Sequence, residues 1–252
     1  MIKLSFMTFV CPTWEIEKVV KFAKQANYDG VEIRVDAGHK HEVSSLTTAD
    51  RRKYVKKLFD DEGVKVPCVA TSIQFGSADP AKRKENIVSA KANLDLAADL
   101  GAKIVRMFAG GGIPGLDMEA AGYIAEAFDE AGDYAKASGV SPMLECGHDI
   151  IVGAKEAEEV FKRVKTSNFC ALWNYSEMNE QTFNVMKSRL RHFHVHEEVL
   201  DPKNDNILHL SKLMKTIGYD GYYSLEIIKG EDLPEDLLIE TAKRLKGYIM
   251  QA

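Results

Sequence analysis

The feature that most constrains the fold of this chain is a regular alternation of strand-like and helix-like segments, repeated eight times along the sequence. The predicted strands cover residues 2–9, 31–34, 64–70, 103–108, 142–145, 169–174, 191–198 and 218–227. The predicted helices cover residues 14–26, 48–62, 80–100, 118–138, 154–164, 180–188 and 207–217, and a last helix begins near residue 234. Strict alternation of this kind predicts parallel strands joined by right-handed crossovers.

Eight strand–helix units in 252 residues is the size of a (β/α)₈ TIM barrel. A weak internal echo supports the same architecture, because A-N-Y-D-G-V-E-I-R and I-G-Y-D-G-Y-Y-S-L-E-I share one helix–turn–strand pattern. The alternative is an open doubly wound sheet, which is expected to carry a glycine fingerprint after its first strand. The segment V-C-P-T-W at that position is not one. We therefore predict an α/β protein with a single-domain (β/α)₈ barrel over residues 1–252.

Local signals mark several of the predicted helix ends. Thr13 is placed to cap the first helix, and Asp79-Pro80 provides a cap followed by proline at the first helical position. The glycine of D-E-G, Gly63, is suited to end the second helix because glycine readily adopts the left-handed conformation.

Composition narrows the classes of function. The formal charge of −5 is too mild to indicate a general attraction to nucleic acid or membranes. The four cysteines are scattered without a CxxC pair, which fits a reducing compartment and argues against a cysteine-built zinc site. The first ten residues fit a strand better than a secretion signal, and no run is long enough to span a bilayer. We expect a cytoplasmic protein.

The functional residues are expected at the carboxyl ends of the strands, where barrels of this kind carry their active sites. The last four predicted strands end in Glu145, Asn174, His196 and Glu226. Two carboxylates, an amide and an imidazole suit a divalent cation such as Mn²⁺, Mg²⁺, Co²⁺ or Zn²⁺, with positions left open for substrate oxygens. The sequence therefore predicts a metal site at this rim.

The same stretches resemble a known family. L-E-C-G-H-D, A-L-W-N-Y-S-E, H-V-H-E-E and G-Y-D-G-Y-Y-S-L-E, together with Y-D-G-V-E-I-R and I-V-R-M-F-A-G-G, resemble the xylose isomerase-like barrel superfamily. Within it they are similar to the sugar isomerase/epimerase branch, which includes ketose 3-epimerases and inosose dehydratases. The resemblance covers essentially the whole chain, and its specificity lies in the order of the motifs and their placement at strand ends.

The resemblance implies one divalent metal bound by Glu, Asp, His and Glu from strands five to eight. The matching positions here are Glu145, Asn174, His196 and Glu226, so three match and asparagine stands where the family has aspartate. An amide oxygen can ligate a hard cation but brings no charge, so metal affinity should fall.

The site also departs from the family pattern around these ligands. Glu177 stands where relatives often place a substrate-binding histidine. Glu197 and Glu198 replace the Lys-Asp, or the later arginine, of many relatives, and Lys203 is the nearest basic residue.

The implied reaction is an isomerisation or epimerisation of a small sugar or polyol derivative through an enediolate. The metal would stabilise the developing charge, and Glu145 with Glu226 would serve as base and acid. One alternative is a barrel that binds a sugar-like ligand without turnover, and Asn174 is the residue that favours it. An endonuclease of the same superfamily is less well supported, because no additional ligands or basic rim are evident. Barrels of this family often pair through rim loops, so a homodimer or homotetramer is compatible with the resemblance.

Further candidates are weighed against structural roles. His148, Glu177, Arg106 and Trp14 are the predicted substrate-binding residues. For His148, a substrate contact and a solvated loop position are equally supported, and Trp14 could either wall a sugar pocket or simply pack. For Glu177, a helix-start carboxylate near the positive helix end is the plainer explanation. Because buried charges must be paired, Arg106 is expected to join an interior ion-pair network.

Two further groups are expected to be structural. His192 and His194 are placed deeper in the barrel than His196, where each would need a hydrogen-bond partner. Glu32 and Arg34 share a face of the second strand and are assigned to the same interior network as Arg106. The glycines at 110–112 could cradle a phosphate, but a flexible loop explains them better because no lysine follows closely.

Overall fold

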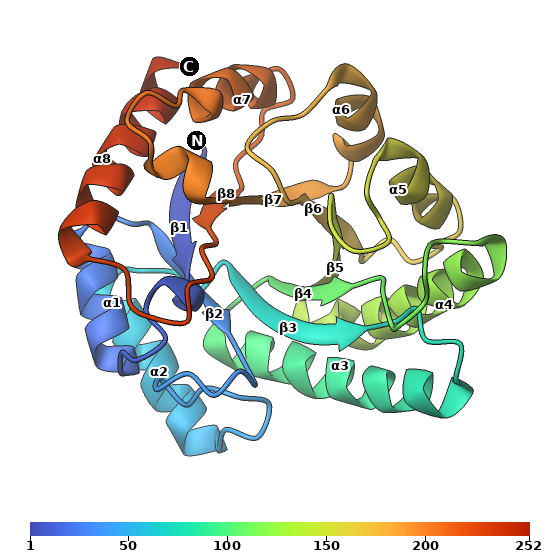
Figure 1. Ribbon diagram of the computed structural model, residues 1–252. Helices are drawn as coiled ribbons and strands as arrows, with labels where there is room; N and C mark the ends of the chain where they lie inside the picture. The colour runs from blue at the N-terminus through green and yellow to red at the C-terminus, as the bar shows by residue number, and fades with distance from the viewer. The chain divides into compact units, whose positions relative to one another are not determined.

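A computed structural model describes the whole chain, residues 1–252 (Figure 1). The strand order is β1 to β8 in a closed barrel, which confirms the predicted (β/α)₈ fold class. The strands are β1 (Lys3–Met7), β2 (Gly30–Arg34), β3 (Cys68–Gln74), β4 (Ile104–Phe108), β5 (Ser141–Cys146), β6 (Cys170–Trp173), β7 (Leu190–Val195) and β8 (Tyr222–Leu225). The helices are α1 (Ile16–Gln25), α2 (Ala49–Glu62), α3 (Pro80–Leu100), α4 (Met118–Ala135), α5 (Ala154–Phe161), α6 (Glu180–Met186), α7 (Asn206–Lys215) and α8 (Glu235–Gln251).

The chain divides into two compact units. Unit 1 comprises Met1–Pro67, Tyr175–Met178 and Arg191–Ala252, and unit 2 comprises Cys68–Asn174 and Asn179–Leu190. That residues 1–252 form one domain stays a prediction.

Unit 1 contains the parallel sheet β7-β8-β1-β2. The first and last strands pair with each other in this sheet: Lys3 is opposite Tyr222, and Ser5 is opposite Ser224 on one side and Gly30 on the other. Helix α8 packs on β1 and against α7, and α1 packs against α2 (Figure 1). The carboxyl ends of β1, β2, β7 and β8 therefore lie along one edge of this sheet.

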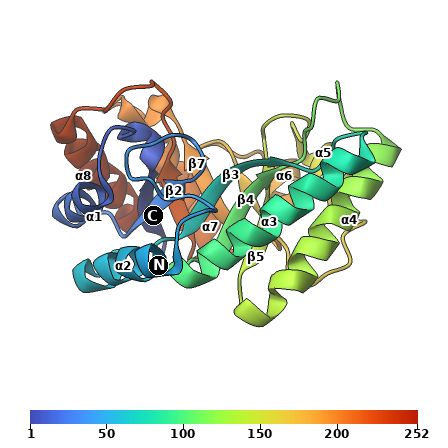
Figure 2. The ribbon, with the colours of Figure 1, turned by 90° about the horizontal axis from the view of Figure 1, so that it is seen from below.

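Unit 2 contains the parallel sheet β3-β4-β5-β6. Cys68, Met143, Cys170 and Leu172 form a buried apolar cluster on these strands. Helices α3 and α4 run side by side over the unit (Figure 2). Burial on both faces explains the mainly apolar sequences of these strands, with Arg106 and Glu145 as buried charged exceptions.

The start of α3 and the end of α2 have the capping residues that the sequence predicts. Asp79 accepts a hydrogen bond from the Ala81 N–H and Pro80 occupies the first turn of α3. Gly63 ends α2 with φ of 67°, in the left-handed region that glycine adopts without steric cost.

Two local predictions were wrong. Thr13 does not cap α1; its N–H and hydroxyl both bind the Asp232 carboxylate, and α1 begins at Ile16 after an N-cap without a side-chain bond. Strand β3 begins at Cys68 and not at residue 64. Pro67 accounts for the late start, because proline has no N–H to donate to a sheet ladder.

Two of the glycines that follow β4, Gly110 and Gly111, are packed closely against neighbouring segments of unit 2, whereas Gly112 has open space around it and a φ of 81°. The Gly76 N–H donates to the Gly110 carbonyl at 2.6 Å, and a Cβ on Gly110 would lie 2.0 Å from the Asp149 carboxylate. Close packing therefore explains Gly110 and Gly111 better than the flexible loop expected from sequence. None of the helices combines the length and apolar character that crossing a bilayer requires.

Candidate active site

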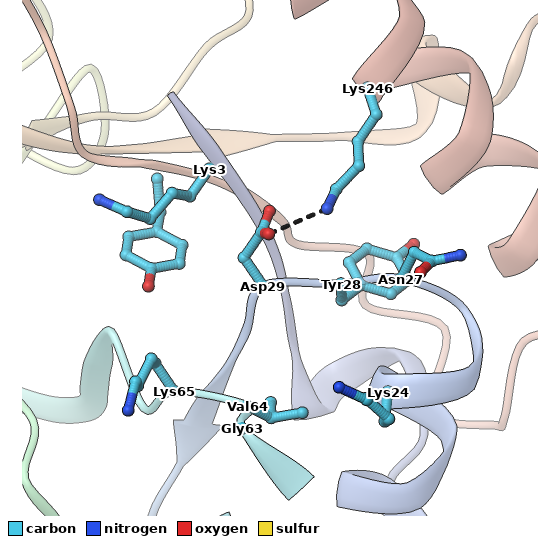
Figure 3. Close-up of a pocket in the computed structure, with 10 residues that line it drawn as sticks. Lys3, Lys24, Asn27, Tyr28, Asp29, Gly63, Val64, Lys65 and Lys246 are labelled. Atoms are coloured by element: carbon cyan, nitrogen blue, oxygen red, sulfur yellow. Dashed lines mark hydrogen bonds and ion pairs between the residues drawn. The ribbon is translucent and has the colours of Figure 1, made fainter. Parts of the chain in front are cut away.

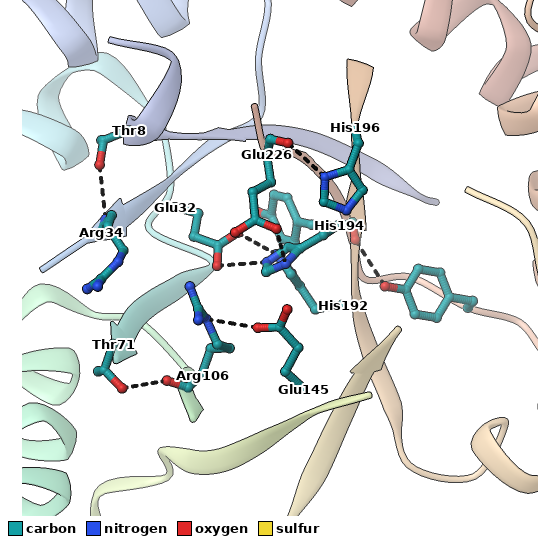
Figure 4. A network of polar contacts seen from close by, with 12 residues as sticks. Thr8, Glu32, Arg34, Thr71, Arg106, Glu145, His192, His194, His196 and Glu226 are labelled. Atoms are coloured by element: carbon teal, nitrogen blue, oxygen red, sulfur yellow. Dashed lines mark hydrogen bonds and ion pairs between the residues drawn. The ribbon is translucent and has the colours of Figure 1, made fainter. Parts of the chain in front are cut away.

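Unit 1 holds a buried cluster of one carboxylate and two imidazoles (Figure 4). Glu32 on β2 binds His192 through its Oε2 at 2.9 Å and His194 through its Oε1 at 3.1 Å, in each case at the histidine Nε2. All three side chains are inaccessible to solvent. Alternation along β7 placed both histidines on the same face, and Glu32 is the hydrogen-bond partner that the sequence required but did not identify.

The histidines keep Glu32 ionised. Burial alone would raise the pKa of this carboxyl, but the charge of His194 and His192 and the hydrogen bonds from both rings hold the pKa well below its usual range. Because a carboxylate only accepts, both Nε2 atoms are the donors. The Nδ1 atom of each ring is therefore the atom whose protonation is not fixed by Glu32.

His194 connects this cluster to a predicted catalytic residue. Its Nδ1 lies 3.0 Å from Glu226 Oε2, just beyond the carboxyl end of β8. A neutral ring that donates from Nε2 presents a lone pair at Nδ1, and a lone pair facing a carboxylate oxygen is repulsive. The pair is satisfied when a cation lies there, either a proton that makes His194 an imidazolium or a metal ion bound by both atoms.

His196 follows the end of β7 and meets the same residue differently. Its Nδ1 donates to the backbone carbonyl of Glu226 at 3.0 Å, which fixes the ring orientation and leaves the proton-free position of the neutral ring at Nε2. Metal-ligating histidines commonly make this kind of bond to a carbonyl or carboxylate. Both His194 and His196 are thus oriented as ligands would be, by Glu32 in one case and by a carbonyl in the other.

The donor set is chemically suited to a divalent ion. Glu32, His192 and His194 each offer one ligand atom, and these atoms lie within 4.8 Å of one another. Buried imidazole and carboxylate groups are the ligands that Zn²⁺, Mn²⁺ and Co²⁺ share. Because both Nε2 atoms donate to Glu32, an ion would bind these rings at Nδ1 or by replacing those two hydrogen bonds.

In unit 2, the predicted catalytic Glu145 forms an ion pair with Arg106 (Figure 4). Arg106 Nε lies 3.2 Å from Glu145 Oε2, and both side chains are 2% exposed. The Arg106 guanidinium also lies over the Phe108 ring, 4.2 Å from its centroid. An interior ion pair of Arg106 is confirmed; its sharing a network with Glu32 and Arg34, and a contact with substrate, stay predictions. Asn174 is buried directly after β6, and its N–H donates to the Cys146 carbonyl at 2.9 Å.

The other three predicted substrate-binding residues make contacts that are common on protein surfaces and in cores. His148 is exposed beside the Phe108 ring, and Glu177 is exposed and accepts a hydrogen bond from Asn206 at 2.7 Å. Trp14 is 5% exposed and packs edge-on against Phe22. Their roles at a site stay predictions.

Sequence reasoning missed a second polar cluster in unit 1. Thr8, immediately after β1, contacts both His39 and His41 in the loop after β2. The signal was present in the sequence, because two histidines spaced by two residues follow the end of a strand at the edge where active sites form.

Unit 1 also has a basic hollow at the amino-terminal ends of its strands (Figure 3). It has a volume of about 340 Å³, and Lys3, Lys24, Lys65 and Lys246 line it. Lys246 is paired with Asp29 at 2.9 Å. Lys24 lies in the last turn of α1, where a cation interacts favourably with the helix dipole.

Comparisons with known proteins agree with this fold. Residues 20–248 match the protein family described as xylose isomerase-like TIM barrel. No protein of curated function has a matching sequence.

Similar solved structures include sugar epimerases. L-ribulose 3-epimerase is 18% identical with a TM-score of 0.81, covering 100% of this chain and 94% of that one. D-psicose 3-epimerase from Clostridium cellulolyticum H10, solved with D-tagatose, is 15% identical with a TM-score of 0.77 and 99% coverage of both chains. The IOLI protein, solved with a bound zinc atom, is 18% identical with a TM-score of 0.78 and 99% coverage of both chains. At these identities the likeness shows the fold alone.

Proposed function

Because this chain belongs to the xylose isomerase-like TIM barrel family, we propose that it is a metal-dependent isomerase or epimerase of a small sugar or polyol derivative. The observation that carries the proposal is the His194–Glu226 contact at 3.0 Å with Glu32 bonded behind it. That arrangement calls for a cation at a strand end, where the family's active sites form. Sugar epimerases among the similar solved structures support the reaction class.

The proposed metal ligands are Glu145, Asn174 and Glu226, together with a histidine from the end of β7. Sequence reasoning assigns that histidine as His196, whereas the contact with the Glu226 carboxylate favours His194. The structural likeness to the zinc-bound IOLI protein supports a divalent ion. The identity of the ion is left to experiment among Mn²⁺, Mg²⁺, Co²⁺ and Zn²⁺.

The proposed chemistry is a proton transfer next to a carbonyl. One of the two carboxylates, Glu145 or Glu226, removes a proton from the carbon adjacent to the substrate carbonyl, and the other returns a proton to the resulting enediolate. A divalent ion, when bound, supplies the positive charge that stabilises this enediolate. Glu32 orients His194, and the His194 ring in turn positions the Glu226 carboxylate.

The test is metal-dependent proton exchange. Protein stripped with EDTA and reloaded with each of the four ions is incubated with D-fructose, D-tagatose or D-psicose in D₂O, and deuterium at C3 is followed by NMR. We expect exchange only with metal, and a loss of at least about 100-fold in Glu145→Gln and in Glu226→Gln. Glu240→Gln, an exposed change on α8, is the control and keeps full activity. No metal-dependent exchange with any of these ketoses would contradict the proposed reaction.

Metal binding by two further variants separates the candidate histidines. His194→Gln and His196→Gln are compared for zinc content after dialysis, with thermal unfolding as a check on folding. The ligand is the histidine whose substitution lowers the zinc content at least about tenfold. If both variants keep the zinc content of the natural protein, neither histidine is a ligand.

A second candidate function is binding of a sugar-like ligand without turnover. Two observations favour it: Asn174 supplies no charge to a metal, and Arg106 already neutralises Glu145. The discriminating variant is Asn174→Asp. If the natural protein binds a ketose without proton exchange, and Asn174→Asp gains both metal and exchange, the second function is the correct one.

A further inference from the structure

The loop between β2 and α2 in unit 1 surrounds a hollow of about 500 Å³ lined by residues 36–44. The loop leaves the carboxyl end of β2, at the same edge of the unit 1 sheet where Glu226 follows β8. Its backbone is held in an unfavourable shape, since the non-glycine residues Asp36 and Glu42 have φ of 55° and 56°. Such conformations persist only where surrounding contacts impose them, and they concentrate at functional sites.

A chain of hydrogen bonds fixes the protonation of the two histidines in this loop. The Val43 N–H donates to His41 Nδ1 at 3.0 Å, so that nitrogen is an acceptor and carries no proton. The neutral His41 ring therefore carries its proton on Nε2 and donates it to the Thr8 hydroxyl at 3.3 Å. Burial lowers the pKa of His41 to about 4, and the adjacent His39 acts in the same direction, so the ring is neutral at pH 7.

The hydrogen bonds that the Thr8 hydroxyl accepts also determine the donor in its contact with His39. Its oxygen accepts from the Arg34 N–H at 3.0 Å and from His41, which uses both of its lone pairs. Its own proton is then left for His39 Nδ1, 3.2 Å away. His39 Nδ1 is consequently an acceptor, and the neutral His39 ring carries its proton on Nε2.

His39 is thus prepared as a fixed hydrogen-bond donor. Burial, followed by the charge of Arg34, lowers the pKa of His39, which keeps the ring neutral. Protonation of Nδ1 would also place a second donor against a Thr8 oxygen whose lone pairs are already used. The ring is half-buried and packs edge-on against Phe9, with centroids 5.4 Å apart. The Nε2–H of His39 has no acceptor in the protein.

We propose that this hollow is a binding site for a neutral polyhydroxylated molecule, in which His39 donates its Nε2–H to a ligand oxygen. The charged side chains that line the hollow are Asp36, Lys40 and Glu42, and the Arg34 charge also reaches His39, so that acidic and basic groups balance and the hollow suits a neutral ligand. Lys40 is moreover paired with Glu15 at 3.1 Å. The choice of a sugar-like ligand rests on the proposed function, whereas the donor at His39 does not.

The first experiment measures the donor directly, with EDTA present so that neither metal nor turnover is involved. Two-bond ¹H–¹⁵N NMR reports which nitrogen of each histidine carries the proton, with His39 assigned from His39→Asn. We expect the Nε2-protonated form for His39 at pH 7. Titration with D-fructose, D-tagatose and myo-inositol is expected to shift His39 Nε2 and to leave His209, an exposed histidine on α7, unmoved. D-fructose 6-phosphate is expected to bind more weakly than D-fructose.

The second experiment separates the two ring nitrogens by substitution. Asparagine can keep an acceptor near the Nδ1 position but has no group at Nε2, whereas glutamine places an amide donor near Nε2. Affinity for D-fructose, measured from backbone amide shifts, is expected to fall about tenfold in His39→Asn, the loss of one hydrogen bond, and to be largely kept in His39→Gln. Thermal unfolding of both variants checks the loop and the fold.

Three outcomes would overturn the inference: a proton on His39 Nδ1, no shift at His39 with any of the three neutral ligands, or weaker binding by His39→Gln than by His39→Asn. The last outcome would assign His39 a purely structural role through Thr8. A shift at His39 with no proton exchange in the natural protein would retain this site and reject the proposed epimerase function. Exchange without a shift at His39 would do the reverse.

Discussion

Glu32→Gln tests how much the hydrogen bonds between Glu32 and the two buried histidines stabilise the protein. The substitution keeps the size of the side chain and one oxygen acceptor, but it turns the other oxygen into an amide donor. That donor would face the Nε2–H of His192 or His194, which lie 2.9 and 3.1 Å from the present carboxylate oxygens. One charged hydrogen bond is lost and one buried donor is left without a partner.

A charged hydrogen bond contributes about 1.5–3 kcal/mol, and an unsatisfied buried donor costs about 1–3 kcal/mol. The variant gains back part of this loss, because a neutral glutamine does not incur the desolvation penalty of a buried carboxylate. We therefore expect the free energy of unfolding to fall by about 3 kcal/mol. In a protein of this size each kcal/mol lowers Tm by about 2–4 °C, so the midpoint should drop by about 6–12 °C.

The assay is urea and thermal unfolding in EDTA, with the exposed Glu240→Gln as a control that changes stability by less than about 0.5 kcal/mol. The pKa of Glu32 is lower in the folded protein than its usual value of 4.5. Its stabilisation is therefore fully present above pH 4.5 and is lost as the pH falls toward the folded-state pKa. The difference between the natural and the variant protein should shrink as the pH falls below 4.5. A loss smaller than about 1 kcal/mol at pH 7 would refute the assignment of Glu32 as the acceptor for both rings.

Three further results are expected. Arg106→Met should destabilise the protein by about 3–5 kcal/mol because it leaves the Glu145 charge buried, and the double variant with Glu145→Gln should recover much of that loss in a denaturation cycle; equal losses in the single and double variants would contradict the pairing. Gly110→Ala should lower Tm because its Cβ would meet the Asp149 carboxylate, whereas Gly122→Ala, in the open middle of α4, should raise stability by about 1 kcal/mol; the same sign for both would count against the packing argument. The four cysteines are buried, and burial raises the pKa of the Cys146 thiol well above its usual range, so a thiol reagent should label the native protein only after urea is added; rapid labelling at pH 7 would disprove this.

The fold could be predicted from sequence because its signals are local. Strand and helix alternation, the Asp79-Pro80 cap and the glycine at Gly63 act within a few residues of the ends that they set. The two misplaced ends had competing causes. Thr13 binds Asp232 instead of capping α1, and β3 begins only after Pro67, which has no N–H for the sheet.

The site could be predicted only in part, because its contacts join residues far apart in the chain. A period of two put His192 and His194 on one face of a strand, but nothing local indicates that Glu32, about 160 positions away, is their shared acceptor. For the same reason sequence could not decide which histidine of β7 meets the Glu226 carboxylate. Strand parity gives the direction of a side chain, and the depth at which it meets a neighbour depends on the register between strands.

The pairing of β1 with β8 also determines when each part of the protein can form during synthesis. The chain emerges from its amino end, so β1 leaves the ribosome long before its partner β8, which ends at Leu225. The strands of unit 2 pair only with neighbours in the chain and can assemble as they emerge. One edge of β1 instead stays unpaired until translation is nearly complete. A truncated chain that lacks β8 would therefore expose this edge, and such nascent chains are the ones expected to need a chaperone.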